Sequence, residues 1–512
     1  MLGGFDEPAG GARVHCADLS SIGAVRLHRC DGPEIRFSRQ SLFDVIEEQF
    51  RDRLLDDAVH GLERMEPQFS ARQVITRRQC VFIMGLLGLV APALVLAPAA
   101  FGSIVMIGLS LWFAANALFR ALLVWVGAEN TQAEPSPRQS QRALPIYSIL
   151  VPLYREANVL SVLIGALKAI DYPADRVDAK LIVEADDTET ITALASLDLD
   201  ARFHVIRVPP SLPRTKPKAC NYALPFIRGE FVVIYDAEDR PEADQLRKAV
   251  AAFRAMPPHV ACLQARLNFY NAQENWLTRV FALDYALWFD FLLPGLDRLS
   301  IPMPLGGTSN HFRSDALRAI HGWDPFNVTE DADIGIRLAR QGFRVRTLDS
   351  TTFEEATTGF GIWLRQRSRW QKGYILTWLV HMRHPLQLLR NAGCWGFLGF
   401  QLFVGGTFVS SLLNPILWAF VLAANLSGAP PFVAAHVCIA CLIVGNGFFV
   451  YLAMLGCCRR GWLGLAPYGL MAPFYWALIS LAGYRGLWQL VGRPWHWEKT
   501  QHGLSRYFTA GV

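Results

Sequence analysis

The sequence predicts an α/β domain with a largely parallel sheet, set between two groups of membrane-spanning helices. Of its 512 residues, 52% are hydrophobic and only 18% are charged, with a mean hydropathy of +0.23; soluble domains carry about 25% charged residues. The middle of the chain alternates short apolar strands with amphipathic helices. Apolar runs long enough to cross a bilayer lie on both sides of it. The length also calls for more than one domain.

The charge balance and the cysteines exclude two classes of protein. A net charge of +5 is small for this length, so we expect no nucleic-acid partner, and a basic cytoplasmic face explains the excess. The 10 cysteines show no spacing typical of a disulfide framework. Cys438 and Cys441 lie in an apolar segment without other ligands, so we expect them to pack rather than bind a metal.

The N-terminal part divides into two predicted regions. Residues 1–79 carry amphipathic helical patterns and no secretory signal, so we interpret them as a cytoplasmic helical segment. Residues 80–127 contain two apolar runs, which predict a transmembrane hairpin. Arg72, Arg77 and Arg78 precede the first run and place that end in the cytoplasm.

The α/β domain is predicted over residues 143–385. Its strands are expected at residues 146–152, 180–184 and 203–208 and at the apolar run that begins at Phe231. Such short apolar strands between amphipathic helices are typical of a sheet buried on both faces.

The C-terminal part is predicted to return to the membrane over residues 386–492. It holds three apolar runs, and three crossings would place the tail, residues 493–512, outside the cell. The tail nevertheless has the composition of an interfacial, cytoplasmic segment. Either one run is re-entrant or one run holds two passes, so the number of spans stays open.

Three carboxylates follow the strand predicted from Phe231. Asp236, Glu238 and Asp239 would lie at the carboxyl edge of the sheet, where open α/β sheets bind ligands. Hard oxygen donors at this spacing suit Mg²⁺ or Mn²⁺ bound together with a diphosphate. We expect Asp236 to be the firmest ligand, while Glu238 and Asp239 stay open as the second. A solvated acidic turn is the alternative.

Two further segments carry residues suited to chemistry. Thr329-Glu330-Asp331 opens an amphipathic helix, where Asp331 could act as a general base or the residues could only cap the helix. Gln366, Arg369 and Trp370 share one face of another predicted helix. A guanidinium there can bind phosphate oxygens, and the indole offers a face to a sugar. A basic helix on the lipid surface is the alternative.

The order and spacing of these segments resemble the family 2 glycosyltransferases, whose nucleotide-binding domain has the GT-A fold. The resemblance rests on motifs in the family's order. In the first half of the domain, Pro145–Glu156 resembles the opening strand, Glu184-Ala-Asp186-Asp187 resembles the acids that contact uridine, and Lys216-Pro-Lys218-Ala-Cys220-Asn221 resembles the Lys-Ala-Gly-Asn segment, with Cys in place of Gly. Further along, Asp236-Ala-Glu238-Asp239 resembles the metal-binding DxD, Thr329-Glu330-Asp331 the TED motif, and Gln366-Arg367-Ser-Arg369-Trp370 the QxxRW motif. With its flanking spans, the set is similar to that of membrane-embedded polysaccharide synthases of the cellulose- and β-glucan-synthase type.

The resemblance implies a role for each motif. Asp331, Glu330 and Asp236 are expected to act in catalysis, and Asp236, Glu238 and Asp239 to hold Mg²⁺ or Mn²⁺. Substrate contacts are expected from the remaining positions, namely Glu184, Asp186, Asp187, Lys218, Asn310, Thr329, Gln366, Arg367, Arg369 and Trp370.

The resemblance also implies an activity and a location. The expected enzyme is a hexosyltransferase that carries out processive, inverting transfer from a UDP-sugar, UDP-glucose being favoured, to a growing β-linked polysaccharide. It would translocate the polymer across the bacterial inner membrane, with its catalytic domain in the cytoplasm. Non-processive transfer to a membrane lipid and an inactive sugar-nucleotide-sensing scaffold stay open as alternatives. The stretch after Trp497 is too short for the cyclic-di-GMP-binding barrel of bacterial cellulose synthases, so we do not expect that regulation. The sequence does not identify an export or regulatory subunit.

Overall fold

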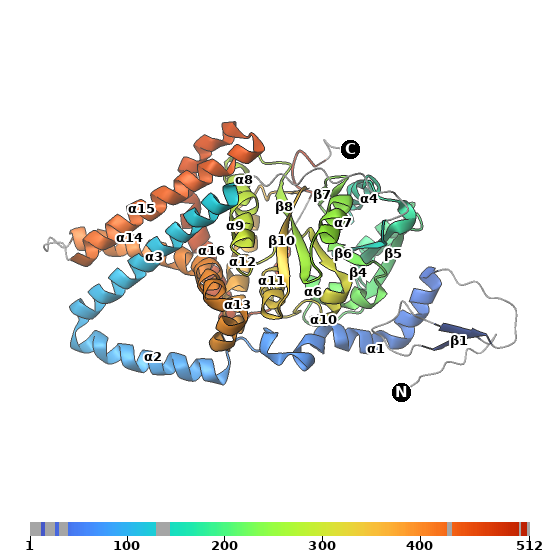
Figure 1. The fold of residues 1–512 in the computed structure, drawn as a ribbon, viewed down its shortest axis with the longest axis horizontal. Coiled ribbons are helices and arrows are strands. Elements are labelled where there is room, and N and C mark those ends of the chain that lie inside the picture. The colour runs from blue at the N-terminus through green and yellow to red at the C-terminus, as the bar shows by residue number, and fades with distance from the viewer. Residues whose placement is uncertain are drawn as a thin grey trace.

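The computed structural model shows an α/β domain from which a bundle of long helices projects to one side (Figure 1). It describes residues 12–15, 26–29, 39–129, 144–426, 433–500 and 503–508. The predicted fold class, an α/β domain between N- and C-terminal groups of membrane helices, is confirmed.

The main sheet of the described chain has eight strands and is mixed rather than wholly parallel. Their order is β5 (Phe203–Val208), β4 (Val177–Glu184), β3 (Tyr147–Leu153), β6 (Phe231–Ile234), β9 (Asn310–Arg313), β8 (Val260–Phe269), β10 (Arg344–Glu354) and β7 (Arg240–Pro241). Strands β3 to β6 run parallel, as does β8 with β10, whereas β9 lies antiparallel between β6 and β8 and β7 is antiparallel to β10. The sequence prediction missed this antiparallel insertion because β9 is short and follows a glycine-rich loop.

Helices cover both faces of this sheet. The alternation along β3 sends Ile149 and Val151 into one core and Leu150 into the other. The first core is closed by α4 (Leu160–Lys168) and α7 (Gln245–Ala255), and α5 (Thr188–Ala195) lies at its edge. The second core is closed by α6 (Lys216–Ala223), α10 (Ser314–Ala319) and α11 (Glu330–Arg340).

The N-terminal helix α1 (Arg39–Met65) belongs to the second core. Its Leu54 and Ala58 are buried with Tyr222 of α6, and the Asn221 side chain donates to the Ala58 carbonyl over 3.2 Å. Strands β1 (Ala12–His15) and β2 (Arg26–Arg29) pair only with each other among the described strands. Helix α1 is therefore packed on α6 of the α/β domain.

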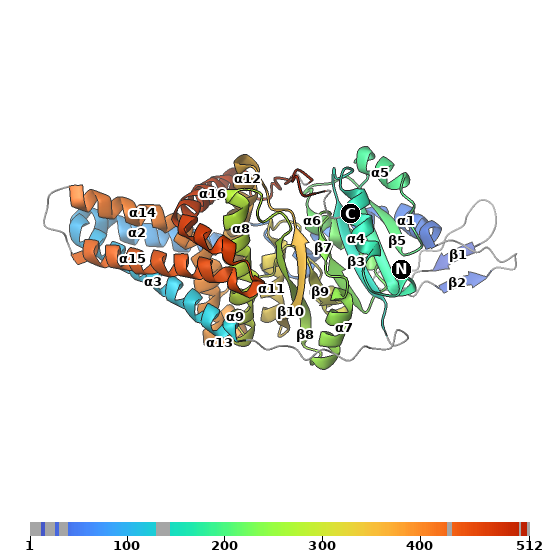
Figure 2. The same ribbon diagram turned by 90° about the horizontal axis from the view of Figure 1, so that it is seen from above.

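Five helical stretches of the described chain are long and apolar enough to cross a membrane. The first two are α2 (Arg77–Leu96) and α3 (Pro98–Ala128). The third, Pro385–Leu426, consists of α13 (Pro385–Phe400), a π-helical turn (Gln401–Gly405) and α14 (Gly406–Leu426). The fourth is α15 (Val433–Gly456) with the turn that follows it, and the fifth, Leu463–Gly492, contains α16 (Ala472–Gly492). Helices α2, α3, α14 and α15 extend together away from the sheet (Figure 2).

Helix α16 runs instead beside α12 (Phe360–His381) at the border of the α/β domain (Figure 2). Near its start, the Tyr475 hydroxyl accepts a hydrogen bond of 2.6 Å from Arg367. Near its end, Gly486 lies so close to α12 that a Cβ would stand 2.7 Å from the Ser368 carbonyl oxygen. Both ends of α16 thus lie beside the α/β domain, which agrees with the re-entrant alternative for the C-terminal runs.

Candidate active site

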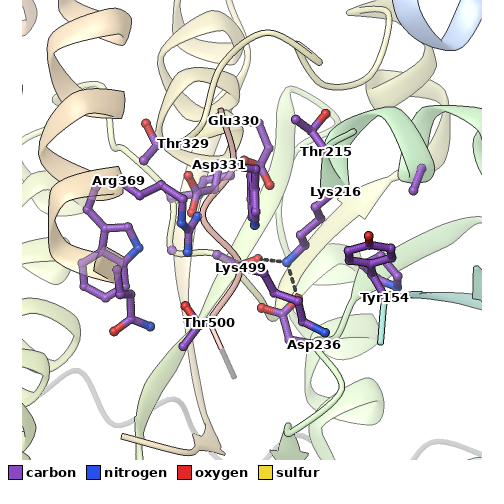
Figure 3. A pocket seen from close by; sticks show the side chains of 18 of the residues that line it. Tyr154, Thr215, Lys216, Asp236, Thr329, Glu330, Asp331, Arg369, Lys499 and Thr500 are labelled. Carbon is purple, nitrogen blue, oxygen red and sulfur yellow. Dashed lines mark hydrogen bonds and ion pairs between the residues drawn. The ribbon is translucent and has the colours of Figure 1, made fainter. Parts of the chain in front are cut away.

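A cavity of about 890 Å³ opens at the carboxyl ends of the parallel strands and extends to the membrane helices (Figure 3). Side chains from many elements form its wall, and four groups stand out. They come from the loop after β6, the start of α11, the helices α12 and α8 (Trp276–Leu287), and the tail after α16. The site therefore lies between the sheet edge and the membrane helices.

The acidic loop after β6 divides its carboxylates between two tasks. Asp236 and Glu238 line the cavity. Asp239 is only 2% exposed, and its carboxylate turns inward to accept from the Asp236 amide over 2.7 Å and from the Thr308 hydroxyl. Burial, and then the charges of Asp236 and Glu238, raise the pKa of Asp239 well above its ordinary value. Of the two residues that the sequence left open, Glu238 is the one that faces the cavity, and Asp239 holds the loop.

Lys216, at the first turn of α6, stands opposite these acids (Figure 3). Its ammonium pairs with Asp236 and donates to the Gly307 carbonyl over 2.6 Å. Burial lowers the pKa of this ammonium, but Asp236 and Glu330 outweigh burial and raise it above its ordinary value. Sequence analysis did not single out Lys216 as a site residue.

Thr329, Glu330 and Asp331 bring a second group of acids to the cavity (Figure 3). The capping alternative does not account for them, because the Thr329 side chain makes no capping bond to α11. Burial raises the pKa of Asp331, and burial together with the charge of Asp331 raises the pKa of Glu330 to about 8. The Gly307 backbone comes so close that a Cβ there would stand 3.4 Å from an Asp331 carboxylate oxygen.

A buried ionic network fixes α11 against α12. One Asp333 carboxylate oxygen pairs with His381 over 3.1 Å, and the other pairs with Arg337 over 2.8 Å. All three side chains are fully buried. Because Asp333 lies two residues after Asp331, this network determines where the first turn of α11 stands in the cavity.

Gln366, Arg367, Arg369 and Trp370 of α12 all line the cavity. Arg367 bonds to the carboxylate of Asp284 in α8 over 2.6 Å, and its guanidinium lies 4.5 Å from the centre of the Trp370 ring. Arg369 places its guanidinium 4.2 Å over the ring of Trp497. Arg367 thus links Trp370 of α12 to α8, while Arg369 stands between the acids of α11 and the tail.

An aromatic wall leads from these residues to the membrane helices. The rings of Trp370 and Tyr285 are stacked with centroids 6.1 Å apart, and Trp288 and Tyr374 continue the lining to Thr407 of α14. Behind Thr407, Arg120 of α3 donates to its hydroxyl over 2.8 Å. Aromatic faces suit the apolar faces of sugar rings, so the inner part of the cavity is chemically suited to an acceptor sugar.

Four residues predicted to contact substrate lie behind the wall. Lys218 is fully buried and pairs with Glu184 over 2.8 Å, so only Glu184 of this pair reaches the cavity. Asp187 caps α5 by accepting from the Thr190 amide over 3.3 Å. Asp186 pairs with Arg214 over 2.6 Å, and Asn310 is buried on β9, where it donates to the Gly306 carbonyl over 2.8 Å. These four side chains are thus not part of the cavity lining and support the loops that form it, and their direct contact with substrate stays a prediction.

The tail after α16 supplies residues that sequence reasoning missed. Trp495, His496, Trp497, Lys499 and Thr500 all line the cavity. The hydroxyl of Thr500 is buried without a hydrogen-bond partner among the described residues. A run of aromatic and basic residues in a polar tail was the available signal, and no substrate contact was predicted from it.

Several contacts hold this tail across the mouth of the cavity. Arg485 of α16 forms two bonds of 2.7 Å with Glu498, and Lys499 pairs with Glu156 over 3.2 Å. Beyond them, the Glu355 carboxylate accepts from three successive backbone amides of the tail, those of Gly503, Leu504 and Ser505, over 2.6, 2.9 and 2.7 Å.

The segment after α1 also reaches the cavity. The Ala71 amide donates to the buried Asp324 over 2.5 Å, and the Ala71 carbonyl accepts from the Trp495 indole over 3.0 Å. Arg72 then contributes to the lining. Burial, and then the charge of Asp333, raise the pKa of Asp324 to about 7.

Asp236 and Glu238 are compatible with a divalent metal ion that is bound partly by the protein and partly by the phosphates of the substrate. No group of three His, Cys, Asp or Glu side chains forms a complete metal site among the described residues. Asp236 and Glu238 can together supply one or two oxygen ligands, with the rest coming from phosphates and water, which is how Mg²⁺ is commonly bound in nucleotide sites.

Comparison with known proteins agrees with this architecture. The family described as "Glycosyl transferase family group 2" matches residues 231–454. The β-monoglucosyldiacylglycerol synthase of Trichormus variabilis is 26% identical over 274 residues, which cover 52% of this chain and 57% of that protein. Glucomannan 4-β-mannosyltransferase 2 of Arabidopsis thaliana is 25% identical over 248 residues, covering 45% and 44%. The chain thus spans about half the length of these relatives.

A solved structure shares the fold. The mannosyltransferase of Pyrobaculum calidifontis, solved in complex with GDP-Man and Mn²⁺, has a TM-score of 0.50 at 19% identity and covers 76% of this chain and 99% of its own. The motif order, the family match over residues 231–454 and these relatives place the α/β domain with the family 2 glycosyltransferases, and the solved structure shares its GT-A fold. Helices long and apolar enough to cross a membrane lie on both sides of this domain.

Proposed function

We propose that the protein transfers a sugar from a UDP-sugar, with UDP-glucose favoured, to a growing β-linked polysaccharide, with inversion at the anomeric carbon. The single observation that carries this is a continuous cavity. It has metal-type carboxylates at one end, Asp331 in the middle and an aromatic wall that ends at Thr407 in a membrane helix.

The donor end of the cavity would bind the diphosphate. Asp236 and Glu238 would hold Mg²⁺ or Mn²⁺, which would neutralise charge on the departing diphosphate. Arg369 brings a guanidinium to the same cavity, where it can pair with phosphate oxygens. Glu184 and Tyr154 line the part farthest along the sheet edge, which is the proposed place of the nucleoside.

The middle of the cavity would carry the transfer itself. Asp331 would take the proton from an acceptor hydroxyl as that oxygen attacks the anomeric carbon from the side opposite the diphosphate. Trp370 would support the ring of the acceptor sugar with its indole face. A single displacement of this kind inverts the anomeric configuration.

The membrane end of the cavity supports polymer transfer rather than a single addition. Arg120 and Asn116 of α3 form a polar cluster with Thr407, and Asn414 of α14 donates to Asn446 of α15 over 3.0 Å. Polar and charged side chains are expensive inside a bilayer and usually line a substrate path. We propose that the polymer leaves along this line, across a bacterial inner membrane with residues 143–385 in the cytoplasm.

Product length tests this function. Purified protein in lipid nanodiscs would receive radiolabelled UDP-glucose with Mn²⁺ or Mg²⁺. High-mass, glucanase-sensitive material is the expected result. A single labelled glycolipid would favour the lipid acceptor suggested by the name of the Trichormus relative. Binding of UDP without turnover of any UDP-sugar would instead favour a sensor.

A substitution at the membrane end tests the polymer path. Thr407→Trp would narrow the inner cavity, and we expect it to shorten the product while leaving UDP affinity unchanged, because the nucleotide site lies at the other end. Thr192→Trp, on the exposed surface of α5, is the matched control for adding an indole. Products of unchanged length from Thr407→Trp would contradict the proposed path.

A further inference from the structure

Lys216 occupies one carboxylate oxygen of Asp236, the residue predicted to be the firmest metal ligand. Its ammonium pairs with Oδ1 of Asp236, and the two side chains are 13% and 31% exposed (Figure 3). The same ammonium donates to the Gly307 carbonyl over 2.6 Å, so two protein oxygens hold it in place. The carboxylate that is best placed to bind a metal is therefore already neutralised by a cation of the protein.

A divalent ion and this ammonium repel each other strongly if both use one carboxylate oxygen. A Mg²⁺ ion lies about 2.0–2.1 Å from its ligand oxygen. An ammonium hydrogen-bonded to the same oxygen would then stand only a few ångströms from the ion, in a partly buried site where repulsion between like charges is weakly screened.

The surroundings of Lys216 offer the ammonium another position. Glu330 lines the same cavity and acts on the Lys216 charge from the side of α11. The Gly307 backbone, which accepts from Lys216, lies beside Asp331. An ammonium that leaves Asp236 thus stays between the two groups of acids, on the proposed path of the donor diphosphate.

We propose that Lys216 is a placeholder cation, which holds Asp236 while no metal is bound and moves to the donor diphosphate when the metal enters. The inference rests on the proposed function, because it takes Asp236 as a metal ligand. Its consequence is reciprocal coupling: the metal binds weakly alone and tightly with a nucleotide diphosphate, since the diphosphate gives the displaced ammonium a partner.

Direct measurement of Mn²⁺ binding tests the inference without relying on activity. The full-length protein would be titrated with Mn²⁺ by electron paramagnetic resonance, with and without UDP. We expect UDP to strengthen Mn²⁺ binding in the wild type. Lys216→Met should strengthen Mn²⁺ binding in the absence of UDP by roughly tenfold, because a like charge beside the ion is gone. The same substitution should weaken UDP binding and shrink the effect of UDP on Mn²⁺.

Three variants make the outcome unambiguous. Lys216→Arg keeps the positive charge and should keep weak Mn²⁺ binding in the absence of UDP. Lys216→Gln, which is also uncharged, repeats the test if the methionine variant does not fold. Asp236→Asn should abolish the site.

The results that would contradict the placeholder inference differ from those that would contradict the proposed metal site. If Asp236→Asn loses Mn²⁺ but both uncharged Lys216 variants bind it no better than the wild type, the placeholder inference fails alone. If Asp236→Asn binds Mn²⁺ like the wild type, the proposed metal site and the inference fail together.

Discussion

Glu330 and Asp331 are neighbours with different environments, and their protonation separates their roles. The pKa of Glu330 is raised to about 8 by burial and by Asp331, so Glu330 holds a proton at neutral pH. Lys216 and Arg369 lower the pKa of both carboxyls, but burial outweighs them, so the pKa of Asp331 is raised as well. Two negative charges at adjacent buried positions repel each other, so ionisation of Asp331 favours the protonated form of Glu330.

Removal of the proposed base should abolish turnover but not binding. We expect Asp331→Asn to slow UDP release from the UDP-sugar by about 10²–10⁴-fold, because the acceptor hydroxyl loses its proton acceptor. UDP affinity, measured by calorimetry, should stay within about twofold, since the proposed nucleotide site lies elsewhere in the cavity. Turnover near the wild-type rate would exclude Asp331 as the base.

Replacing its neighbour should have a much smaller effect. Glu330→Gln resembles the protonated state that Glu330 holds at neutral pH, so we expect a loss of less than about tenfold in the same assay. The comparison controls for the loss of one carboxyl group from this helix start. Equal losses in the two variants would contradict the separate roles.

The sequence could predict which residues follow a strand or open a helix, but it could not predict whether their side chains face the cavity. Asp236, Glu238 and Asp331 reach the cavity, and they directly follow β6 or open α11. Lys216 and Lys218 are two residues apart on one helix, so they point in nearly opposite directions. The family motif pointed to Lys218, which is buried, whereas Lys216 faces the cavity.

The tail is held by several contacts, and those of Glu355 are concentrated on one side chain. Glu355 accepts from three backbone amides, and Glu355→Gln leaves only one oxygen acceptor to do so. We expect faster proteolysis within residues 493–508 and several-fold weaker UDP binding, because the tail lines the cavity. Asp349→Asn, which removes an exposed carboxylate of β10, is the control. Unchanged proteolysis of Glu355→Gln would show that other contacts hold the tail.

The segment after α1 should be sensitive to pH through Asp324. Its pKa is about 7 in the folded protein and lies near 3.8 when the chain is unfolded. Because folding raises this pKa, the protonated carboxyl stabilises the folded protein. This contribution to the free energy of unfolding is complete at a pH below the unfolded pKa of 3.8 and is lost as the pH rises through about 7. The wild-type melting temperature should therefore fall between pH 5.5 and pH 8.

Asp324→Asn cannot ionise, so its melting temperature should fall less over the same range. Differential scanning fluorimetry in detergent would measure both proteins, and Asp315→Asn, an exposed carboxylate on α10, is the control. Parallel curves for the wild type and Asp324→Asn would contradict the role of this buried carboxylate. Sequence patterns could not reveal Asp324, because its partner at Ala71 lies 253 residues away.

The whole molecule was predictable in outline, since the fold class and the flanking groups of spans followed from alternation and hydropathy. The parity of the spans was not predictable. A helix packed against α12 and a helix in lipid both require apolar surfaces, so composition alone does not separate α16 from a true span. Contacts of α16 with α12 favour the re-entrant alternative, and the number of spans stays a prediction.

A topology experiment follows from this placement. We expect reporter fusions after Gly461 and after Val512 to lie on the same side of the membrane, because α16 runs along the border of the α/β domain. A fusion after Leu96 should lie on the opposite side and serves as the control. Reporters on opposite sides after Gly461 and Val512 would show that α16 crosses the bilayer.

The residues of the tail follow all the candidate membrane spans of the described chain, so the ribosome adds them later, yet they form part of the cavity wall. While the nascent chain is still being made, the strands and the acids can assemble, but the enclosure over the donor is missing. Water would have access to any nucleotide-sugar bound at that stage. The order of synthesis therefore completes the cavity only after the described membrane helices have been made.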